Sequence, residues 1–369
     1  MASEANWIAH PGAYIKEEMD ERGWSQRDLA FILDCSEQAI NPILTGKRNI
    51  SPDMARALGS AFDVPAEFFA NLQQMYDLAH ARIPDASVEV RRKMQSTYPV
   101  REMIRRGWIE LTDASMLEFQ LEKFFEDQDV PYMAHAAKKS SYEEREIPPA
   151  QLAWLFRVRQ IARSISVPKY TDRALRSAIP DLQQLMYAPE ETRHIPRVLM
   201  EAGVRFIIVE KLPNAKIDGV CFWLDDQSPV IGMSLQHDRI DNFWFVLRHE
   251  IEHVLNGHGK TEEMIDTDLD SVNESAPREE RIANDAASDF CAPADKLDSF
   301  MARKHPFYYE KDVVAFARIM QRHPGIVVGQ IRKRLNRWDY LTRYLVKVRQ
   351  HVLPGAIADG WGQVVPVSL

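Results

Sequence analysis

Residues 243–256 read Phe-Trp-Phe-Val-Leu-Arg-His-Glu-Ile-Glu-His-Val-Leu-Asn, and this stretch decides how the rest of the chain is interpreted. His249 and His253 are four residues apart, so on a helix both imidazoles project from one face, close enough to hold one metal ion. Leu247 and Ile251 fall on roughly the opposite side. The pattern therefore predicts a helix that packs into a core on one face and holds metal on the other.

Glu250 directly follows the first of these histidines. Two neutral imidazoles suit zinc, and a neighbouring carboxylate can take a proton from a water molecule that attacks a carbonyl. The alternative interpretation is a buried helix with two incidental histidines. A third ligand elsewhere in the chain would favour the metal site.

The best candidate for a third ligand is Glu280, in the segment Glu280-Arg-Ile-Ala-Asn284. Its carboxylate starts a second predicted helix, and Asn284 lies one turn further on. Asn284 could bind the free ring nitrogen of a ligand histidine and so fix its tautomer. His258 follows the first motif one residue too early for the metzincin spacing, which sets that class aside.

These motifs resemble the ImmA/IrrE metallopeptidases, in which a His-Glu-x-x-His helix is followed by a Glu-x-x-Ala-Asn type helix. The resemblance covers residues 199–297, including the short predicted strands at 202–209 and 229–233. It implies a Zn2+ cofactor held by His249, His253 and Glu280, with Glu250 as the general base. It further implies a peptidase that cuts a repressor or partner on a signal.

Residues 10–82 form a run of short predicted helices separated by turn residues. Gly23 ends the first, and Ser25 can cap the second with Asp28 at the capping-box position. Ser36 can cap the third. Two short helices joined by a tight turn, followed by cations, are typical of a helix-turn-helix that reads DNA.

In such a module, Gln38 and Asn41 could reach base edges. The predicted DNA-facing residues are Gln26, Ser36, Gln38, Asn41, Thr45, Lys47 and Arg48. The net charge of residues 10–82 is −4, from seven Lys and Arg against eleven Asp and Glu, which favours the alternative of a helical dimerisation module. Pro42 lies inside the third helix, where it removes a backbone bond and can kink the axis.

Ser25-Gln-Arg-Asp-Leu-Ala30 and Ile43-Leu-Thr-Gly-Lys-Arg48 resemble the XRE-type helix-turn-helix of HigA-like antitoxins. This resemblance covers most of residues 10–80. It implies that operator DNA is a partner and that the module can neutralise a cognate toxin. We also expect a homodimer.

The chain has 369 residues, three cysteines and a net charge of −8, as expected for an ordinary globular protein with two or three domains. The cysteines form no metal-type pair, so they are expected to be buried hydrophobes, although Cys291 could approach the metal. No apolar run approaches membrane-spanning length and no signal sequence is evident. We therefore expect no membrane partner and a cytoplasmic location.

The predicted fold class is mainly α with a small β-sheet (α+β). We expect a helix-turn-helix bundle in residues 1–82, a helical connector in 83–198, and a zincin-like domain with a C-terminal helical extension in 199–369. Residues 300–322 are predicted to be helical. The acidic run at 261–274 is predicted to be a solvated segment or a cover over the zinc site.

Three functions are compatible with these patterns. The leading hypothesis is an antitoxin-like, DNA-binding transcriptional regulator fused to a zinc-dependent peptidase. The second is a repressor or antitoxin whose zincin-like domain is a non-catalytic sensor or interaction module. The third is a peptidase whose N-terminal helices serve only dimerisation.

Overall fold

The structure is a computed structural model that describes residues 8–81, 87–125, 147–260, 264–266, 277–360 and 363–364. The chain divides into two compact units, Met1–Ala86 and Ser87–Leu369, which are described separately below. The division of the second unit into a connector and a zincin-like domain stays a prediction.

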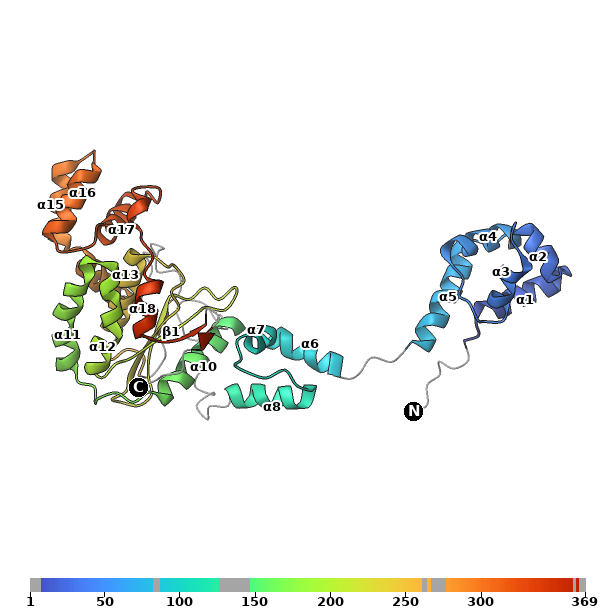
Figure 1. The fold of residues 1–369 in the computed structure, drawn as a ribbon, viewed down its shortest axis with the longest axis horizontal. Helices are drawn as coiled ribbons and strands as arrows, with labels where there is room; N and C mark the ends of the chain where they lie inside the picture. Colours follow the sequence, from blue (N-terminus) through green and yellow to red (C-terminus); the bar gives the residue numbers. More distant parts are fainter. Residues whose placement is uncertain are drawn as a thin grey trace. The chain divides into compact units, whose positions relative to one another are not determined.

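The N-terminal unit is a bundle of short helices (Figure 1). The helices are α1 (Pro11–Arg22), α2 (Gln26–Ile32), α3 (Glu37–Leu44), α4 (Pro52–Phe62) and α5 (Ala66–His80). Their shared core contains Ile15, Leu29, Ile40, Leu58, Phe62 and Phe69, all at most 2% exposed.

The boundaries of these helices follow from local chemistry. Gly23 has the left-handed φ of 66° that ends α1. Ser25 and Asp28 form the predicted capping box, which is confirmed: the Ser25 side chain accepts from the Asp28 backbone, and the Asp28 side chain accepts from the Ser25 backbone. Gly12 allows α1 to approach α3, because a Cβ at this position would lie 2.1 Å from the carbonyl oxygen of Ile43.

The second unit combines helices with a mixed sheet (Figure 1). Its first helices are α6 (Ser87–Thr97), α7 (Val100–Arg105), α8 (Ala114–Phe125), α10 (Pro149–Ser164), α11 (Asp172–Gln184) and α12 (Ile195–Glu201), with 3-10 turns η2 (Leu185–Tyr187) and η3 (Pro189–His194). The later helices are α13 (Ile240–Leu255), α14 (Arg278–Cys291), α15 (Ala294–Lys304), α16 (Glu310–Ile319), α17 (Pro324–Leu335) and α18 (Arg349–Val352), with η4 (Thr342–Tyr344) and η5 (Leu353–Gly355). The strands are β1 (Arg205–Val209), β2 (Gly219–Trp223), β3 (Pro229–Met233), β4 (Met264–Asp266), β5 (Ile357–Gly360) and β6 (Gln363–Val364).

Within the described residues the sheet has the order β4-β2-β3-β1-β5-β6. β1 runs parallel to both β3 and β5, whereas β2 runs antiparallel to β3 and to β4. β2 therefore lies one strand in from the β4 edge, and its register pairs Gly219 with Asp266 and with Met233.

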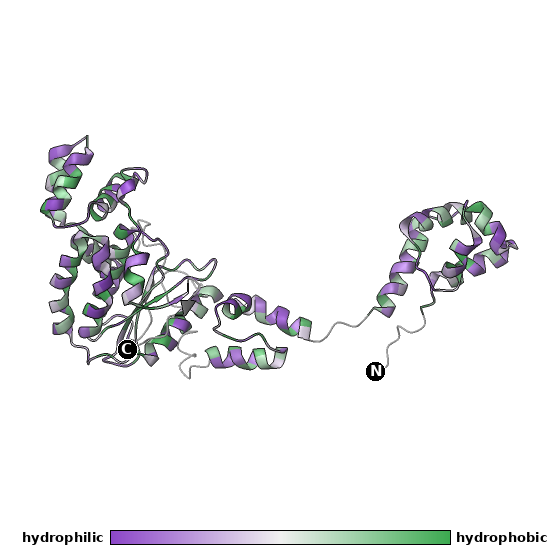
Figure 2. Ribbon diagram, in the orientation of Figure 1, coloured by the Kyte–Doolittle hydropathy of each residue, from purple (hydrophilic) through white to green (hydrophobic). Residues whose placement is uncertain are grey.

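Helices cover both faces of this sheet, and alternate residues of β1 point to opposite faces. Phe206 and Ile208 join the core beneath α13, whereas Ile207 and Val209 join the core beneath α10. Trp154 of α10 is fully buried there, and its indole Nε1 donates to the carbonyl oxygen of Val209 at 2.8 Å. The strands are correspondingly hydrophobic over most of their length (Figure 2).

Two expectations about the C-terminal part are wrong. The predicted helical stretch at 300–322 is two helices, α15 and α16, because Pro306 has no N–H with which to continue the first. The C-terminal extension is also not wholly helical, since β5 joins the sheet beside β1 and pairs Ile207 with Ile357. Such pairing depends on contacts distant in sequence.

The predicted fold class is confirmed: the protein is mainly helical with a small mixed sheet. Among the described residues, no helix has the length and apolar character needed to cross a bilayer.

Candidate metal centre and nucleic-acid interface

Helix α13 carries the His-Glu-x-x-His motif through the middle of the second unit. Its apolar residues pack below the sheet, and Leu247 and Ile251 are at most 1% exposed. Helix α14 lies against α13, and Trp244 contacts Phe290 with ring centroids 6.2 Å apart. This packing brings the N-terminal turn of α14 beside the histidines of α13.

The structure brings together the three residues predicted to bind metal. His249 and His253 are fully buried, and their Nε2 atoms are 2.9 Å apart. The Glu280 carboxylate lies with Oε2 3.3 Å from Nε2 of His249 and Oε1 3.5 Å from Nε2 of His253. One ligand atom from each residue lies within 4.8 Å of the others.

These separations fit a zinc ion. Ligands at about 2.0–2.1 Å from a tetrahedral zinc ion lie about 3.3 Å from one another. Two imidazole nitrogens 2.9 Å apart also need a proton or a metal ion between them, because neutral lone pairs repel. The Glu280 side chain is 18% exposed, which leaves the carboxylate side of the group more open to solvent than the histidines.

Glu250, the predicted general base, is fully buried beside β2. Gly219 is the first residue of that strand, and a Cβ there would lie 2.0 Å from Oε1 of Glu250. Only glycine therefore leaves room for this carboxylate in its present position. The sequence alone could not indicate this contact, because it depends on how β2 packs against α13.

The remaining nitrogen of His253 contacts His258, which the sequence spacing set aside as a metzincin-type metal ligand. Nδ1 of His253 lies 2.9 Å from Nδ1 of His258. Burial lowers the pKa of His258, although the nearby charges of Glu279 and Glu252 act to raise it. The side-chain amide oxygen Oδ1 of Asn284 is buried and makes no hydrogen bond to any residue that the structure describes. The predicted bond from Asn284 to a ligand histidine is therefore not among the contacts found.

Two other predictions concern the surroundings of the three metal-ligand candidates. Cys291 is a free, fully buried thiol, and burial raises its pKa to about 12, as expected of a small hydrophobic residue. In the acidic run, residues 261–263 and 267–274 lie outside the described residues. Between those two stretches only the backbone strand β4 is described, paired with β2.

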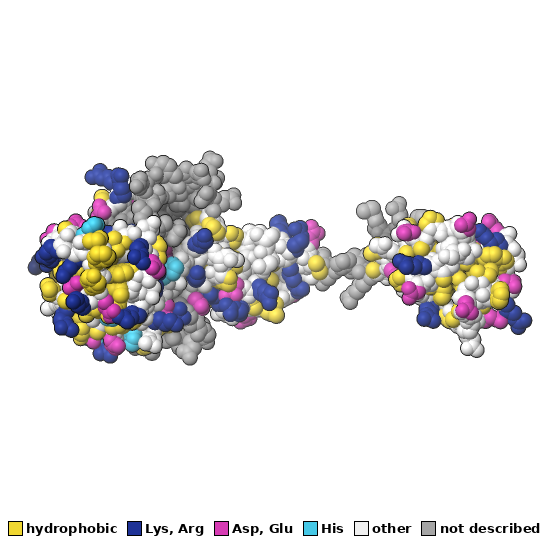
Figure 3. Space-filling model, turned by 90° about the horizontal axis from the view of Figure 1, so that it is seen from above, with side chains coloured by type: hydrophobic (Ala, Val, Ile, Leu, Met, Phe, Trp, Pro, Cys, Tyr) yellow, Lys and Arg dark blue, Asp and Glu magenta, His cyan; other side chains and the backbone are white. Residues whose placement is uncertain are grey.

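The N-terminal unit contains the second candidate site, formed by α2, the turn after it, α3 and the turn that follows α3. Most of the predicted DNA-facing residues are exposed on these elements: Ser36, Gln38, Asn41, Thr45, Lys47 and Arg48. Gln26 is half-buried, and its Nε2 donates to the carbonyl oxygen of Glu37 at 2.9 Å, which ties α2 to α3. Acidic and basic side chains are interspersed on the face of this unit seen in Figure 3.

Comparison with known proteins addresses this N-terminal part. A helix-turn-helix family model matches residues 15–69. Virulence-associated protein A' of Dichelobacter nodosus is 41% identical over 71 residues, which cover 19% of this chain and 62% of that protein. The HTH-type transcriptional regulator YddM of Escherichia coli K12 is 32% identical over 71 residues, 19% of this chain and 76% of that protein.

The chain belongs to the helix-turn-helix family. Among solved structures, the Pseudomonas aeruginosa antitoxin HigA with its higBA promoter is 34% identical, with a TM-score of 0.20 over 24% of this chain and 92% of that one. The helix-turn-helix match occupies residues 15–69, and the three metal-ligand candidates, His249, His253 and Glu280, lie outside it.

Within the helix-turn-helix, one expectation about α3 needs correction. Ser36 occupies the N-cap position, but its side chain makes no capping hydrogen bond. Pro42 lies inside α3, as predicted, and the helix continues to Leu44. The carbonyl oxygen of Pro42 accepts the backbone N–H groups of Lys47 at 2.7 Å and Arg48 at 3.0 Å. The two cations are thus held in a fixed turn directly after the helix.

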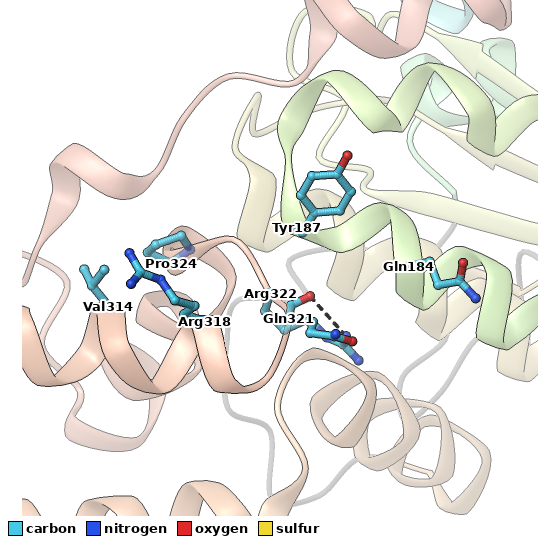
Figure 4. Close-up of a pocket in the computed structure, with 7 residues that line it drawn as sticks. All are labelled: Gln184, Tyr187, Val314, Arg318, Gln321, Arg322 and Pro324. Carbon is cyan, nitrogen blue, oxygen red and sulfur yellow. Dashed lines mark hydrogen bonds between the residues drawn. The ribbon is translucent and has the colours of Figure 1, made fainter.

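A cavity of about 540 Å³ lies elsewhere in the second unit, between α11 and α16 (Figure 4). It is lined by Gln184, Tyr187, Val314, Arg318, Gln321, Arg322 and Pro324, so none of the metal-ligand candidates faces it. Arg322 is buried, which lowers its pKa, and its guanidinium donates at 3.4 Å to the carbonyl oxygens of Gln183 and Phe290. Those carbonyls lie at the C-terminal ends of α11 and α14. A cation there is stabilised by the negative end of each helix dipole.

Proposed function

We propose that this chain is an antitoxin-like, DNA-binding transcriptional regulator whose second unit is a zinc-dependent peptidase. The observation that carries the peptidase part is the meeting of His249, His253 and Glu280, with the buried Glu250 next to His249 on the same helix. Two imidazoles and one carboxylate are the protein ligands of a common catalytic zinc site, which leaves a position for water or substrate.

The residues of this group have separate roles in the proposed reaction. His249, His253 and Glu280 hold the ion, and the full burial of His249 and His253 keeps bulk water away from the two imidazoles. Zinc, when bound, polarises the scissile carbonyl and favours loss of a proton from the attacking water. Glu250 accepts that proton and later donates it to the leaving amine, which is why its carboxylate must be held in one position.

The role of Gly219 supplies a first test. We expect Gly219→Ala to retain zinc but to lower cleavage of an unstructured peptide mixture by at least about 100-fold, because the new methyl group displaces the Glu250 carboxylate. Mass spectrometry would measure the cleavage and elemental analysis the zinc. Val220→Ala is the matched control, since this neighbour belongs to the core on the α10 side of the sheet. Equal cleavage by Gly219→Ala and the parent would contradict the proposed position of Glu250.

For the N-terminal unit we propose that operator DNA is the partner. Support comes from the helix-turn-helix match, from the relative described as a transcriptional regulator, and from the exposed polar residues of α3. Gln38 and Asn41 would contact base edges, while Lys47 and Arg48, held by the carbonyl of Pro42, would contact phosphates.

Changing Lys47 and Arg48 to Ala together tests this interface. We expect the full-length variant to bind DNA selected from a random duplex library more weakly than the parent does. The slope of log affinity against log salt concentration should fall by about 2 per protomer, because two phosphate contacts are lost. Lys16→Ala with Arg56→Ala is the control, since it removes the same charge from exposed positions on α1 and α4. Equal losses in both double variants would indicate only a general charge effect.

We also propose a homodimer formed through the N-terminal unit. Phe68, Met75 and Leu78 of α5 are 43%, 51% and 70% exposed, and their spacing places them along one side of the helix. A cognate toxin and a repressor substrate remain part of the proposal through the resemblance to HigA-like antitoxins and ImmA/IrrE peptidases.

A further inference from the structure

We propose that His258 is a positioning residue that fixes the tautomer and the ring orientation of His253. This inference rests on the proposed zinc site, to which His258 itself does not contribute a ligand. It assigns a role to the turn that follows α13. This turn lies outside both the His-Glu-x-x-His motif and the helix-turn-helix match.

The two nitrogens of His253 have different neighbours. Nε2 faces Nε2 of His249 at 2.9 Å and the Glu280 carboxylate at 3.5 Å, so this nitrogen would bind the metal through its lone pair. Nδ1 must then carry the ring proton. The atom 2.9 Å from it is Nδ1 of His258, which in the neutral imidazole can accept that proton as a hydrogen bond.

Backbone contacts hold His258 in place. Its N–H donates to the carbonyl oxygen of His253 at 2.9 Å, and its own carbonyl oxygen accepts from the indole Nε1 of Trp223 at 2.8 Å. Gly257 and Gly259 have φ values of 69° and 79°, which favour glycine. A Cβ at Gly259 would also lie 2.6 Å from the carbonyl oxygen of Cys221, so the turn is packed closely against β2.

A hydrogen bond to the non-ligating nitrogen does three things for a metal-binding histidine. It selects the tautomer, limits rotation of the ring, and raises the basicity of the ligating nitrogen. His249 and Glu280 come from rigid helices, and His258 adds a fixed acceptor for the remaining ligand. The turn after α13 therefore contributes to metal affinity without touching the metal.

The test compares zinc affinity and ligand geometry in full-length variants. His258→Phe removes the acceptor, and we expect it to weaken zinc binding by about 10–100-fold in competition with a chelator. His258→Asn places an oxygen near the position of Nδ1, and we expect affinity close to that of the parent. The absorption spectrum of the Co2+-loaded protein should change in His258→Phe and be restored in His258→Asn, which a purely structural role would not predict.

Controls separate this inference from the proposed function. His351→Phe removes a histidine from α18 and should bind zinc like the parent. Circular dichroism of the zinc-free proteins checks folding, and His258→Ala replaces the Phe variant should that variant not fold. If His249→Ala loses zinc while His258→Phe and His258→Ala bind it as the parent does, the role of His258 is wrong and the zinc site stands. A parent protein that binds no zinc would overturn both.

Discussion

Glu280→Ala is expected to remove zinc from the purified protein, with the content falling from about one ion per chain to near zero. Glu280 is the ligand candidate that comes from α14, so without it the two histidines of α13 hold the ion alone. Loss of contacts that merely orient a ligand costs about 10–100-fold in affinity, so loss of a ligand should weaken binding by more than about 100-fold. Elemental analysis and chelator competition measure this directly.

Glu279→Ala is the matched control for that change. It removes an exposed carboxylate from the adjacent position of the same helix turn, so both variants lose one charge and gain an alanine. We expect Glu279→Ala to keep about one zinc ion per chain. Equal zinc content in Glu280→Ala and Glu279→Ala would show that Glu280 is not a ligand and would remove the basis of the peptidase proposal.

Glu250→Gln is expected to abolish peptide cleavage while zinc stays bound. The amide fills the same buried space beside Gly219 but cannot accept the proton of the attacking water. General base catalysis contributes about 10²–10⁴-fold, so cleavage should fall by at least that range. The measurement is the mass-spectrometric rate of peptide cleavage, with zinc content determined on the same sample.

Glu252→Gln serves as the control on the same helix. Glu252 pairs with Arg248 at 2.7 Å, and the pKa of its carboxyl is lowered by the hydrogen bond and charge of Arg248 in spite of burial. We expect this variant to cleave at a rate near that of the parent. A zinc-loaded parent that cleaves no peptide and regulates its promoter identically to Glu250→Gln would favour the non-catalytic sensor instead.

Local sequence patterns predicted the parts of the site that lie on single helices. The spacing of His249 and His253 indicated a shared helix face, and a carboxylate at the start of a second helix indicated Glu280. The capping box at Ser25 and the helix end at Gly23 followed from short-range chemistry in the same way. In these cases the residues lie within a few turns of one another in the sequence, or they form part of a motif that resembles a known family.

Contacts between distant segments could not be predicted in this way. The need for Gly219 arises only when β2 packs beside α13, and the approach of His258 to His253 depends on a turn held by Trp223. The pairing of β5 with β1 joins residues about 150 positions apart, and no local periodicity of a four-residue strand reveals it. The prediction of one continuous helix at 300–322 is wrong for another reason. Here the sequence itself contains the helix breaker, Pro306.

The most direct test of the central claim is an anomalous difference map collected at the zinc edge from crystals of the full-length protein. We predict one strong peak at about 2.0–2.2 Å from Nε2 of His249, Nε2 of His253 and a carboxylate oxygen of Glu280. Zinc-loaded protein with no peak at this position, or with a peak held by other residues, would contradict the account.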